Sequence, residues 1–523
     1  MNQAGHIFAK DARHLRWEIA ISLALTAAYV LVAPAQWKPE AGAGGAWVMI
    51  GELRLLAALL GLLVGVSWWL LITRVAQDES LVGDRQWWIT KPYQWGELLS
   101  AKILFLAAFI FLPIVIAKGA VLAEGGFAPF AYLPGLGYSL VLFAAFLILP
   151  LLAIAMVTST FARATLTTLG VLLALMVVAI VAGISNGGGG FTLWWIGRLP
   201  IAILLVAGGA AMGLQYARRR TWAVRLMLAG ALVLVGVILS FAGNSALVAM
   251  TYPRGSAPLQ LTNESGSKVT GYAQFGGHGL VGIAVPVQVS GIAAGTAVNL
   301  DAVQVQAVAG DGRQWTSRWE SMWGARYRPD SDPELMAPLS LQIDRPFYEA
   351  EQAHPVTLHL RFAVTELRAG NPVQIAMPAT EFSVPGFGIC LPLDPEAPGD
   401  FTDLHCRAAL RQPMATFVQV QWSDEKCGMS GTGAGTTTPG HGWAGALTSE
   451  PASFGINSIE EASFDLSNHA HAMPGRDVVE PRHLCPGLPI TFTPYSVEGR
   501  SEYDVTFANY QMPELRPGAH LDQ

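Results

Sequence analysis

Charge is scarce in this sequence, and its shortage excludes several classes of protein. Only 13% of the 523 residues are Asp, Glu, Lys or Arg, whereas 52% are hydrophobic and the mean hydropathy is +0.39. This balance is typical of a chain that lies partly in lipid. No stripe rich in Lys and Arg is present to neutralise a phosphate backbone, so we expect no nucleic acid among the partners.

The sequence motifs of nucleotide-hydrolysing and other hydrolytic enzymes are also missing. No GxxxxGK[ST], GxGxxG, HExxH or GxSxG pattern stands in a supporting context of strand and helix. We therefore expect no catalytic residue and no cofactor in this chain. His469 and His471 could place two rings on one face of a strand, but no third ligand follows at a fixed spacing, so solvent-exposed histidines are favoured over a metal site.

Cysteine is confined to the second half of the chain. The four cysteines are Cys390, Cys406, Cys427 and Cys485. An even set within one region indicates two disulfides and an oxidising compartment, although the sequence leaves the pairing open. Four unpaired thiols in a reducing compartment are the alternative, and the topology argued below disfavours them.

The charges that are present divide unevenly. Residues 1–249 contain 16 Lys and Arg against 9 Asp and Glu, whereas residues 250–523 contain 16 against 29. A basic half is thus joined to an acidic half, and the basic half is the apolar one. The two halves therefore predict separate domains in different environments.

Seven segments of the basic half have the length of about 20 apolar residues that is needed to cross a hydrocarbon core of about 30 Å. The predicted membrane spans are 17–33, 54–73, 101–122, 135–158, 164–184, 196–216 and 223–243. The charges in or beside them all lie close enough to a span end to snorkel to the headgroups: Glu18, Arg54, Lys102 and Lys118. No ion-coupled mechanism is indicated.

The distribution of Lys and Arg predicts how the chain is oriented. On one side of the predicted spans only Lys38, Lys118 and Arg198 lie near the span ends. The other side contains Lys10, Arg13, Arg16, Arg74, Arg85, Lys91, Lys102, Arg163, Arg218, Arg219, Arg220 and Arg225. By the positive-inside rule the N-terminus is cytoplasmic, with residues 1–16 as a basic surface helix, and the chain after residue 243 is extracytoplasmic. We expect a multi-pass protein of the bacterial cytoplasmic (inner) membrane, with the lipid bilayer as a partner.

The residues after 250 predict an all-β, sandwich-like extracytoplasmic domain. Alternating or continuous β-branched and aromatic patterns occupy 281–289, 297–308, 356–364, 416–422, 489–497 and 503–512. Pro and Gly concentrate at 385–399, which favours two lobes, 250–385 and 400–523. The spacing of Trp315, Trp319, Trp323 and Tyr327 predicts one helical face, and the glycine-rich segment 428–442 predicts a loop of low complexity.

One long connection between predicted spans, residues 74–102, is rich in both charged and aromatic side chains. Such a segment suits the docking of a cytoplasmic partner, whereas a connector anchored in the headgroups would explain the aromatic residues but explains the acidic ones less well. The residues that we expect to couple to a partner are Glu79, Gly83, Trp87, Trp88, Lys91, Pro92 and Lys102.

At this connection the chain resembles the ABC-2 type transporter permease family. The resemblance rests on Glu79, Gly83, Pro92 and Lys102, with two leucines ahead of the lysine, and it extends over about residues 1–220. It implies a helical permease that docks a separate ATP-binding subunit and pairs with a second permease copy, as a homodimer or a heterodimer. Asp84 stands where the family commonly has Thr, and the exterior domain is an addition. The alternative hypothesis is a non-transporting membrane-anchored protein whose β domain binds an envelope ligand or partner.

Overall fold

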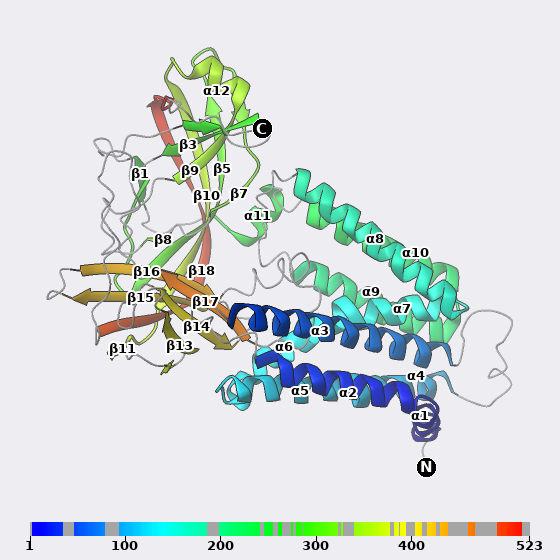
Figure 1. The fold of residues 1–523 in the computed structure, drawn as a ribbon. Coiled ribbons are helices and arrows are strands. Elements are labelled where there is room, and N and C mark those ends of the chain that lie inside the picture. The colour runs from blue at the N-terminus through cyan, green and yellow to red at the C-terminus, as the bar shows by residue number, and fades with distance from the viewer. Residues whose placement is uncertain are drawn as a thin grey trace.

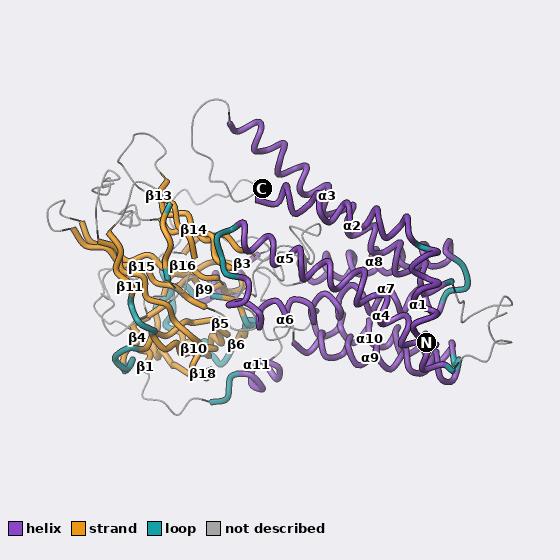
Figure 2. Tube along the Cα trace, turned by 90° about the horizontal axis from the view of Figure 1, so that it is seen from below, coloured by secondary structure: helices purple, strands orange, loops and turns teal. Residues whose placement is uncertain are grey.

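The computed structural model contains a helical domain and a β domain that meets one end of the helices (Figure 1). In Figure 2 the helices and the strands occupy opposite sides of the molecule. The structure describes residues 3–34, 46–78, 94–185, 198–240, 245–254, 260–263, 273–275, 279–285, 287–322, 326–327, 339–376, 381–385, 388–393, 403–409, 416–424, 429–437, 459–465 and 489–514.

Long apolar helices make up the first half of the chain. Their bounds are α1 Gln3–His14, α2 Arg16–Val32, α3 Ala46–Gln77, α4 Trp95–Leu106, α5 Leu112–Glu124, α6 Leu133–Phe143, α7 Leu149–Val157, α8 Phe161–Ser185, α9 Arg198–Arg218, α10 Thr221–Ser240 and α11 Ser245–Thr251. The helices α4 and α5 belong to one rod, Trp95–Glu124, and α6 and α7 belong to a second, Pro129–Val157.

Five helical rods among the described residues are long and apolar enough to cross a membrane, or six if α1 and α2, which are bent by 74°, form one span. The five are Leu55–Gln77, Trp95–Glu124, Pro129–Val157, Leu199–Arg218 and Thr221–Ile238. The expected number of seven is not confirmed. The fifth predicted segment lies in α8, and the part of this helix whose side chains are described, Phe161–Val177, is a shorter apolar helix.

Two of the rods contain a π-helical turn that ends two residues before a proline. Ala107–Phe111 precedes Pro113, and Ala144–Ile148 precedes Pro150. Proline has no N–H to donate to the carbonyl four residues earlier, and its ring crowds that carbonyl, so the preceding turn widens. The surrounding sequences AAFIFLP and AAFLILP are nearly the same. This short repeat was missed in the sequence and explains why both rods have the same irregularity.

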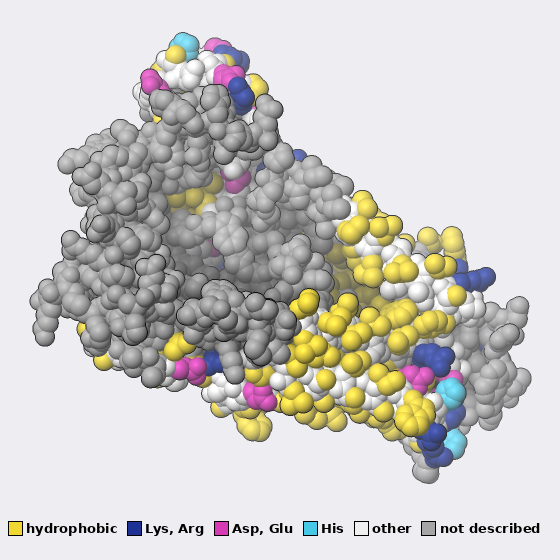
Figure 3. All heavy atoms as spheres, viewed as in Figure 1, with side chains coloured by type: hydrophobic (Ala, Val, Ile, Leu, Met, Phe, Trp, Pro, Cys, Tyr) yellow, Lys and Arg dark blue, Asp and Glu magenta, His cyan; other side chains and the backbone are white. Residues whose placement is uncertain are grey.

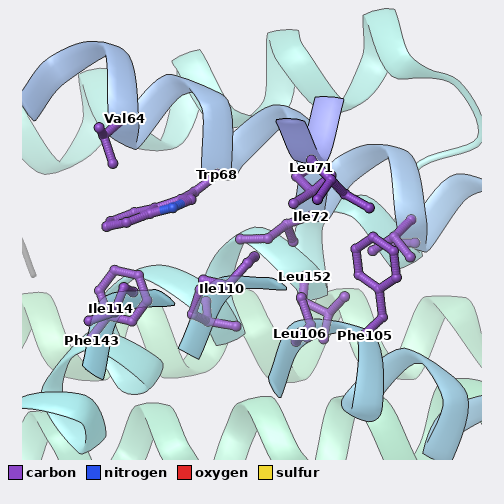
Figure 4. Close-up of a cluster of buried hydrophobic side chains, with 14 of the residues drawn as sticks. Val64, Trp68, Leu71, Ile72, Phe105, Leu106, Ile110, Ile114, Phe143 and Leu152 are labelled. Atoms are coloured by element: carbon purple, nitrogen blue, oxygen red, sulfur yellow. The ribbon is translucent and has the colours of Figure 1, made fainter. Parts of the chain in front are cut away.

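The core of the helical domain lies between α3 and the two rods that follow it (Figure 4). Trp68 of α3 meets Phe143 edge to face, with 5.0 Å between the ring centroids, and Leu71 and Ile110 are fully buried nearby. The outward faces are apolar too: Leu62 is 56% exposed, and Figure 3 shows a broad hydrophobic surface over these helices. Such a surface is unfavourable in water and favourable in lipid, as expected for a membrane protein.

The β domain consists of antiparallel sheets. The strands are β1 Gln260–Asn263, β2 Ala273–Phe275, β3 Leu280–Val285, β4 Val287–Ser290, β5 Thr296–Val308, β6 Gln314–Thr316, β7 Glu320–Ser321, β8 Arg326–Tyr327, β9 Leu339–Asp344, β10 Val356–Ala369, β11 Val373–Ala376, β12 Phe382–Val384, β13 Gly388–Leu393, β14 Asp403–Ala409, β15 Thr416–Asp424, β16 Met429–Thr437, β17 Ile459–Asp465 and β18 Pro489–Tyr510. A short helix, α12 Arg345–Glu351, follows β9.

A nine-stranded curled sheet forms the centre of this domain. Its order is β16-β15-β18-β10-β5-β6, with β11 on β18 and with β7 and β8 on β5. Smaller sheets have the orders β12-β13-β14-β17, β2-β3-β9 and β1-β4. Because β10 pairs with β18, the main sheet crosses the boundary that was predicted between two lobes, and the division into lobes stays a prediction.

The main sheet and the three-stranded sheet enclose a two-layer core. Leu358, Leu360 and Phe362 of β10 are fully buried on one face, as their alternation predicted. Ile283 of β3 and Leu341 of β9 belong to the same buried cluster, so the small sheet covers the large one. The expectation of a β domain after the helical half is thereby confirmed, as curled antiparallel sheets, and the sandwich-like arrangement stays a prediction.

Three local expectations in the β domain are wrong. The described residues of the aromatic run, 315–322 and 326–327, contain the short strands β6, β7 and β8 instead of a helix, because each strand finds hydrogen-bond partners along β5. Residues 429–437 of the glycine-rich segment form β16, which pairs along its length with β15. The two predicted strands at 489–497 and 503–512 are one strand, β18, because the β10 ladder continues across the residues between them. Ladder partners supplied by distant segments override these local patterns.

A disulfide links two neighbouring strands of the four-stranded sheet. Cys390 of β13 lies opposite Cys406 of β14, and the two are bonded with their Cα atoms 4.0 Å apart. Both side chains are fully buried. This pairing is one that the sequence left open, while Cys427 and Cys485 lie outside the described residues.

The double variant Cys390→Ser/Cys406→Ser is expected to lose about 3 kcal/mol of β-domain stability, because a cross-link over a loop of this size restricts the unfolded chain by about that amount. The measurement is thermal unfolding of the purified protein, together with peptide mapping without reductant. Mapping should find the two cysteines in one linked pair. Free thiols at both positions in protein from an oxidising compartment would contradict the assignment.

The β domain meets the helical domain through two groups of contacts. Ile389 of β13 packs against the turn after α5, where Gly126 has a φ of +84° and a Cβ would collide with the isoleucine side chain. Glycine is required there for both reasons. In the second group, Trp319 packs with Tyr252, just after α11, and with Ile238 of α10.

Candidate functional site

Basic side chains gather at the end of the helical domain that lies away from the β domain (Figure 3). We call this the basic end. Arg74 at the end of α3 bonds Glu18 at the start of α2 over 3.2 Å, and Arg225 near the start of α10 donates to the carbonyl of Val157 at the end of α7 over 2.7 Å. These contacts bring together the ends of α2, α3, α7 and α10. Their Lys and Arg residues belong to the set that the sequence assigned to one side of the membrane.

A buried ion pair connects α1 to α4 at the basic end. Lys102 Nζ donates to Asp11 Oδ2 over 2.7 Å, and the two side chains are 2% and 0% exposed. Taking two charges out of water costs several kcal/mol per ion, and their attraction offsets this cost only in a closed, well-positioned pair. The pair thus has a strong preference for one placement of α1 against α4.

Further contacts hold α1 along the same face of the rod. The backbone N–H of Ala4 donates to Glu97 Oε2 over 3.0 Å. Phe8 stacks on Phe109, with 5.7 Å between the centroids and 7° between the ring planes. Ile7 is buried between these contacts. Residues 3–14 of the predicted segment 1–16 are therefore helical, as α1, and one face of this helix packs on protein, whereas its place at a membrane surface stays a prediction.

Lys10 connects the buried pair to the end of α3. Its Nζ lies 3.3 Å from Asp11 Oδ1 and 3.3 Å from Asp78 Oδ2. His14 Nε2 lies 3.7 Å from Asp78 Oδ1. Since Asp78 directly precedes segment 79–93 and α4 directly follows it, both ends of that segment are tied to α1.

The structure places one of the seven predicted coupling residues. Lys102 lies in the buried pair, so the expectation that it snorkels to the headgroups is wrong. Lys118 of α5 is also buried, at 2% exposure, and that expectation is wrong for it as well. The other six lie outside the described residues, as do the two histidines considered for a metal: Glu79, Gly83, Trp87, Trp88, Lys91, Pro92, His469 and His471.

Asp11 is the functional candidate that sequence reasoning missed. It lies in one apolar stripe with Ala4 and Ile7 of α1 and with Leu15, which directly follows α1, and all four are buried. The spacing of three and four residues places them on one helical face. A carboxylate in such a stripe signals a buried cationic partner, although the sequence does not identify which one.

Comparison with known protein families, with curated proteins and with solved structures finds no match to this chain. The site therefore has to be interpreted from its own geometry.

Proposed function

We propose that this chain is the membrane-spanning permease subunit of an ABC transporter, and that an ATP-binding subunit docks on segment 79–93 at the basic end. One observation carries the proposal. The buried Asp11–Lys102 pair, with Lys10 and Asp78, fixes the two ends of this segment to a single helix. A docking element transmits force to the spans only if its ends are rigidly attached to them.

The contacts at the two ends of segment 79–93 indicate the path along which a movement of this segment would reach the spans. A displacement of segment 79–93 acts directly on the last turn of α3 and on the start of α4, and the buried pair makes α1 move with α4. Chain continuity and tight packing then pass the movement along the rods toward the β domain. We propose that the basic end is cytoplasmic, that two permease copies assemble, and that the β domain handles or gates an exported substrate outside.

The proposal is tested by affinity isolation of the intact protein in mild detergent. We expect a nucleotide-binding ATPase to copurify, and we expect it to be lost when segment 79–92 is replaced by a Gly/Ser linker of the same length. Replacing segment 185–195, which also contains aromatic residues but is predicted to lie on the opposite side of the membrane, is the matched control and should leave the ATPase bound.

Two results would count against this assignment. Retention of the ATPase after replacement of segment 79–92 would place the docking site elsewhere. Isolation of the intact chain with no ATPase, but with an envelope protein bound through the β domain, would favour the membrane-anchored binding protein instead.

A further inference from the structure

A polar pocket opens at the basic end between the start of α4 and the end of α9. Its volume is about 440 Å³, within the range of small-molecule sites. It is lined by Gln94, Trp95, Tyr216, Ala217, Arg218 and Arg219. None of these six residues is acidic, so among the described residues that line the pocket the charged groups are positive.

The end of α9 supplies two of these positive groups. Arg218 is the last residue of the helix, and Arg219 has a φ of +52°, in the left-handed region that commonly ends helices. The Arg219 N–H donates to the carbonyl of Gln215 over 3.2 Å, which holds this reversal in place. Two successive residues, Arg218 and Arg219, therefore contribute guanidinium groups to one wall of the pocket. Guanidinium groups match phosphate oxygens in charge and in geometry.

The start of α4 supplies backbone hydrogen-bond donors on the other wall, while the carboxylate of Glu97 in its first turn accepts from the N–H of Ala4. Gln94, the residue before the helix, has an extended backbone with φ −74° and ψ 138° and makes no side-chain capping bond. Its carbonyl accepts the N–H groups of Glu97 and Leu98. The N–H groups of Trp95 and Gly96 have no intrahelical acceptor, and a helix start attracts anions for this reason.

The aromatic residues around the pocket place it at the level of lipid headgroups. Trp95 lines the pocket and is 53% exposed, and Trp222, the second residue of α10, is 71% exposed. Exposed tryptophans at the ends of membrane spans lie at the boundary between hydrocarbon and water. Phosphate in the headgroups of the inner leaflet is abundant at that depth.

We propose that this pocket binds the phosphate of an anionic phospholipid headgroup, which bridges Arg218 and Arg219 of α9 to the start of α4. The bound lipid would link α9 to the rod that begins directly after segment 79–93. The inference concerns lipid binding alone and holds whether or not an ATPase docks on that segment.

Native mass spectrometry of the intact protein, transferred from nanodiscs that contain equal amounts of phosphatidylglycerol and phosphatidylcholine, tests the proposal. The wild-type protein should retain phosphatidylglycerol selectively. Arg218→Gln/Arg219→Gln should reduce this retention about tenfold, because charge-assisted hydrogen bonds to the phosphate are lost. Arg218→Gln alone should give a smaller loss and serves if the double variant is not monodisperse.

The matched control is Arg163→Gln/Arg220→Gln, which removes two exposed arginines of the basic end that do not line the pocket. It should retain phosphatidylglycerol like the wild type. An equal loss in the control would show diffuse attraction and overturn the proposal, as would equal retention of the two lipids by the wild type. Displacement of the lipid by millimolar inorganic phosphate would show that the pocket takes free phosphate and would overturn the lipid assignment.

Discussion

Lys102→Met is expected to destabilise the helical domain by about 3–5 kcal/mol, because it leaves Asp11 as a buried carboxylate without its principal partner. Asp11→Leu should have a similar effect, since it leaves the ammonium group of Lys102 buried. The 2.7 Å contact between these side chains joins residues that are 91 positions apart. Loss of the contact therefore releases α1 from α4.

The double variant Asp11→Leu/Lys102→Met distinguishes a buried pair from two independent side chains. Replacing both charges by apolar groups removes the cost of desolvation together with the attraction, so the double variant should be close to wild type and more stable than either single variant. Arg74→Gln, which breaks the half-exposed pair with Glu18 at the same end, is the control. It should cost less than about 1 kcal/mol.

The measurement is the midpoint of thermal unfolding in detergent, followed by size-exclusion chromatography of the surviving protein. Limited proteolysis near α1 provides a second observable, because release of this helix should expose its connection to α2. If both single variants unfold within about 1 kcal/mol of the wild type, the pair does not hold α1 in place. A double variant that loses the sum of the two single effects would also contradict the assignment.

The second large effect is expected at Asp301, where the β domain meets the helical domain. Opposite β10, the register passes from Ala302 directly to Leu300, so Asp301 is the extra residue of a β-bulge in β5. A bulge redirects the side chain that it contains. The carboxylate thereby reaches Tyr252, next to α11, whose hydroxyl donates to Oδ2 over 2.9 Å.

Asp301→Ala is expected to cost about 3 kcal/mol or more, because three donors that this carboxylate accepts would lose their acceptor. Besides Tyr252, these are Asn299, which donates over 2.6 Å, and Thr365. Tyr252→Phe removes one donor only and should cost about 1 kcal/mol. Asp311→Ala, at an exposed aspartate in the loop between β5 and β6, is the matched control and should have little effect.

The effect of Asp301→Ala also depends on pH. Burial raises the pKa of Asp301 above its ordinary value, although hydrogen bonds from Thr365, Tyr252 and Asn299 oppose the shift. A carboxyl whose pKa is higher in the folded than in the unfolded protein contributes most stability at low pH, and the contribution falls as the pH rises from about 4 through the raised pKa. The deficit of the variant should therefore shrink as the pH rises over this interval.

The measurement is unfolding of the full chain by denaturant, with the protease susceptibility of the β domain as the readout. The difference between the wild type and Asp301→Ala at each pH gives the loss of stability. Glu320 also has a pKa raised by burial, to about 7. It therefore makes stability fall with rising pH in the wild type and in Asp301→Ala alike. The comparison with Asp301→Ala removes this shared contribution. A deficit that is constant with pH, or one that grows as the pH rises, would contradict the raised pKa of Asp301.

Regular local patterns were predicted from the sequence with success. The alternation of Leu358, Leu360 and Phe362 identified one buried face of β10, because side chains alternate across any strand whatever its neighbours are. The apolar segments likewise identified the long helices, since a backbone in lipid has to satisfy its own hydrogen bonds. The number of spans and the short strands after β5 could not be predicted from such local patterns.

What the sequence determined by itself is the division into an apolar, basic, helical half and an acidic β half, because composition and periodicity act through near neighbours. The tertiary structure alone decided which charges are buried and what they meet. The sequence indicated that Lys102 lies at the end of a span, whereas in the structure it is buried against Asp11. Nothing in the sequence distinguishes Asp301 from the other acidic residues, but in the structure a β-bulge directs it toward Tyr252. The free energy of a buried charge is set by its partner, and the partner lies far along the chain.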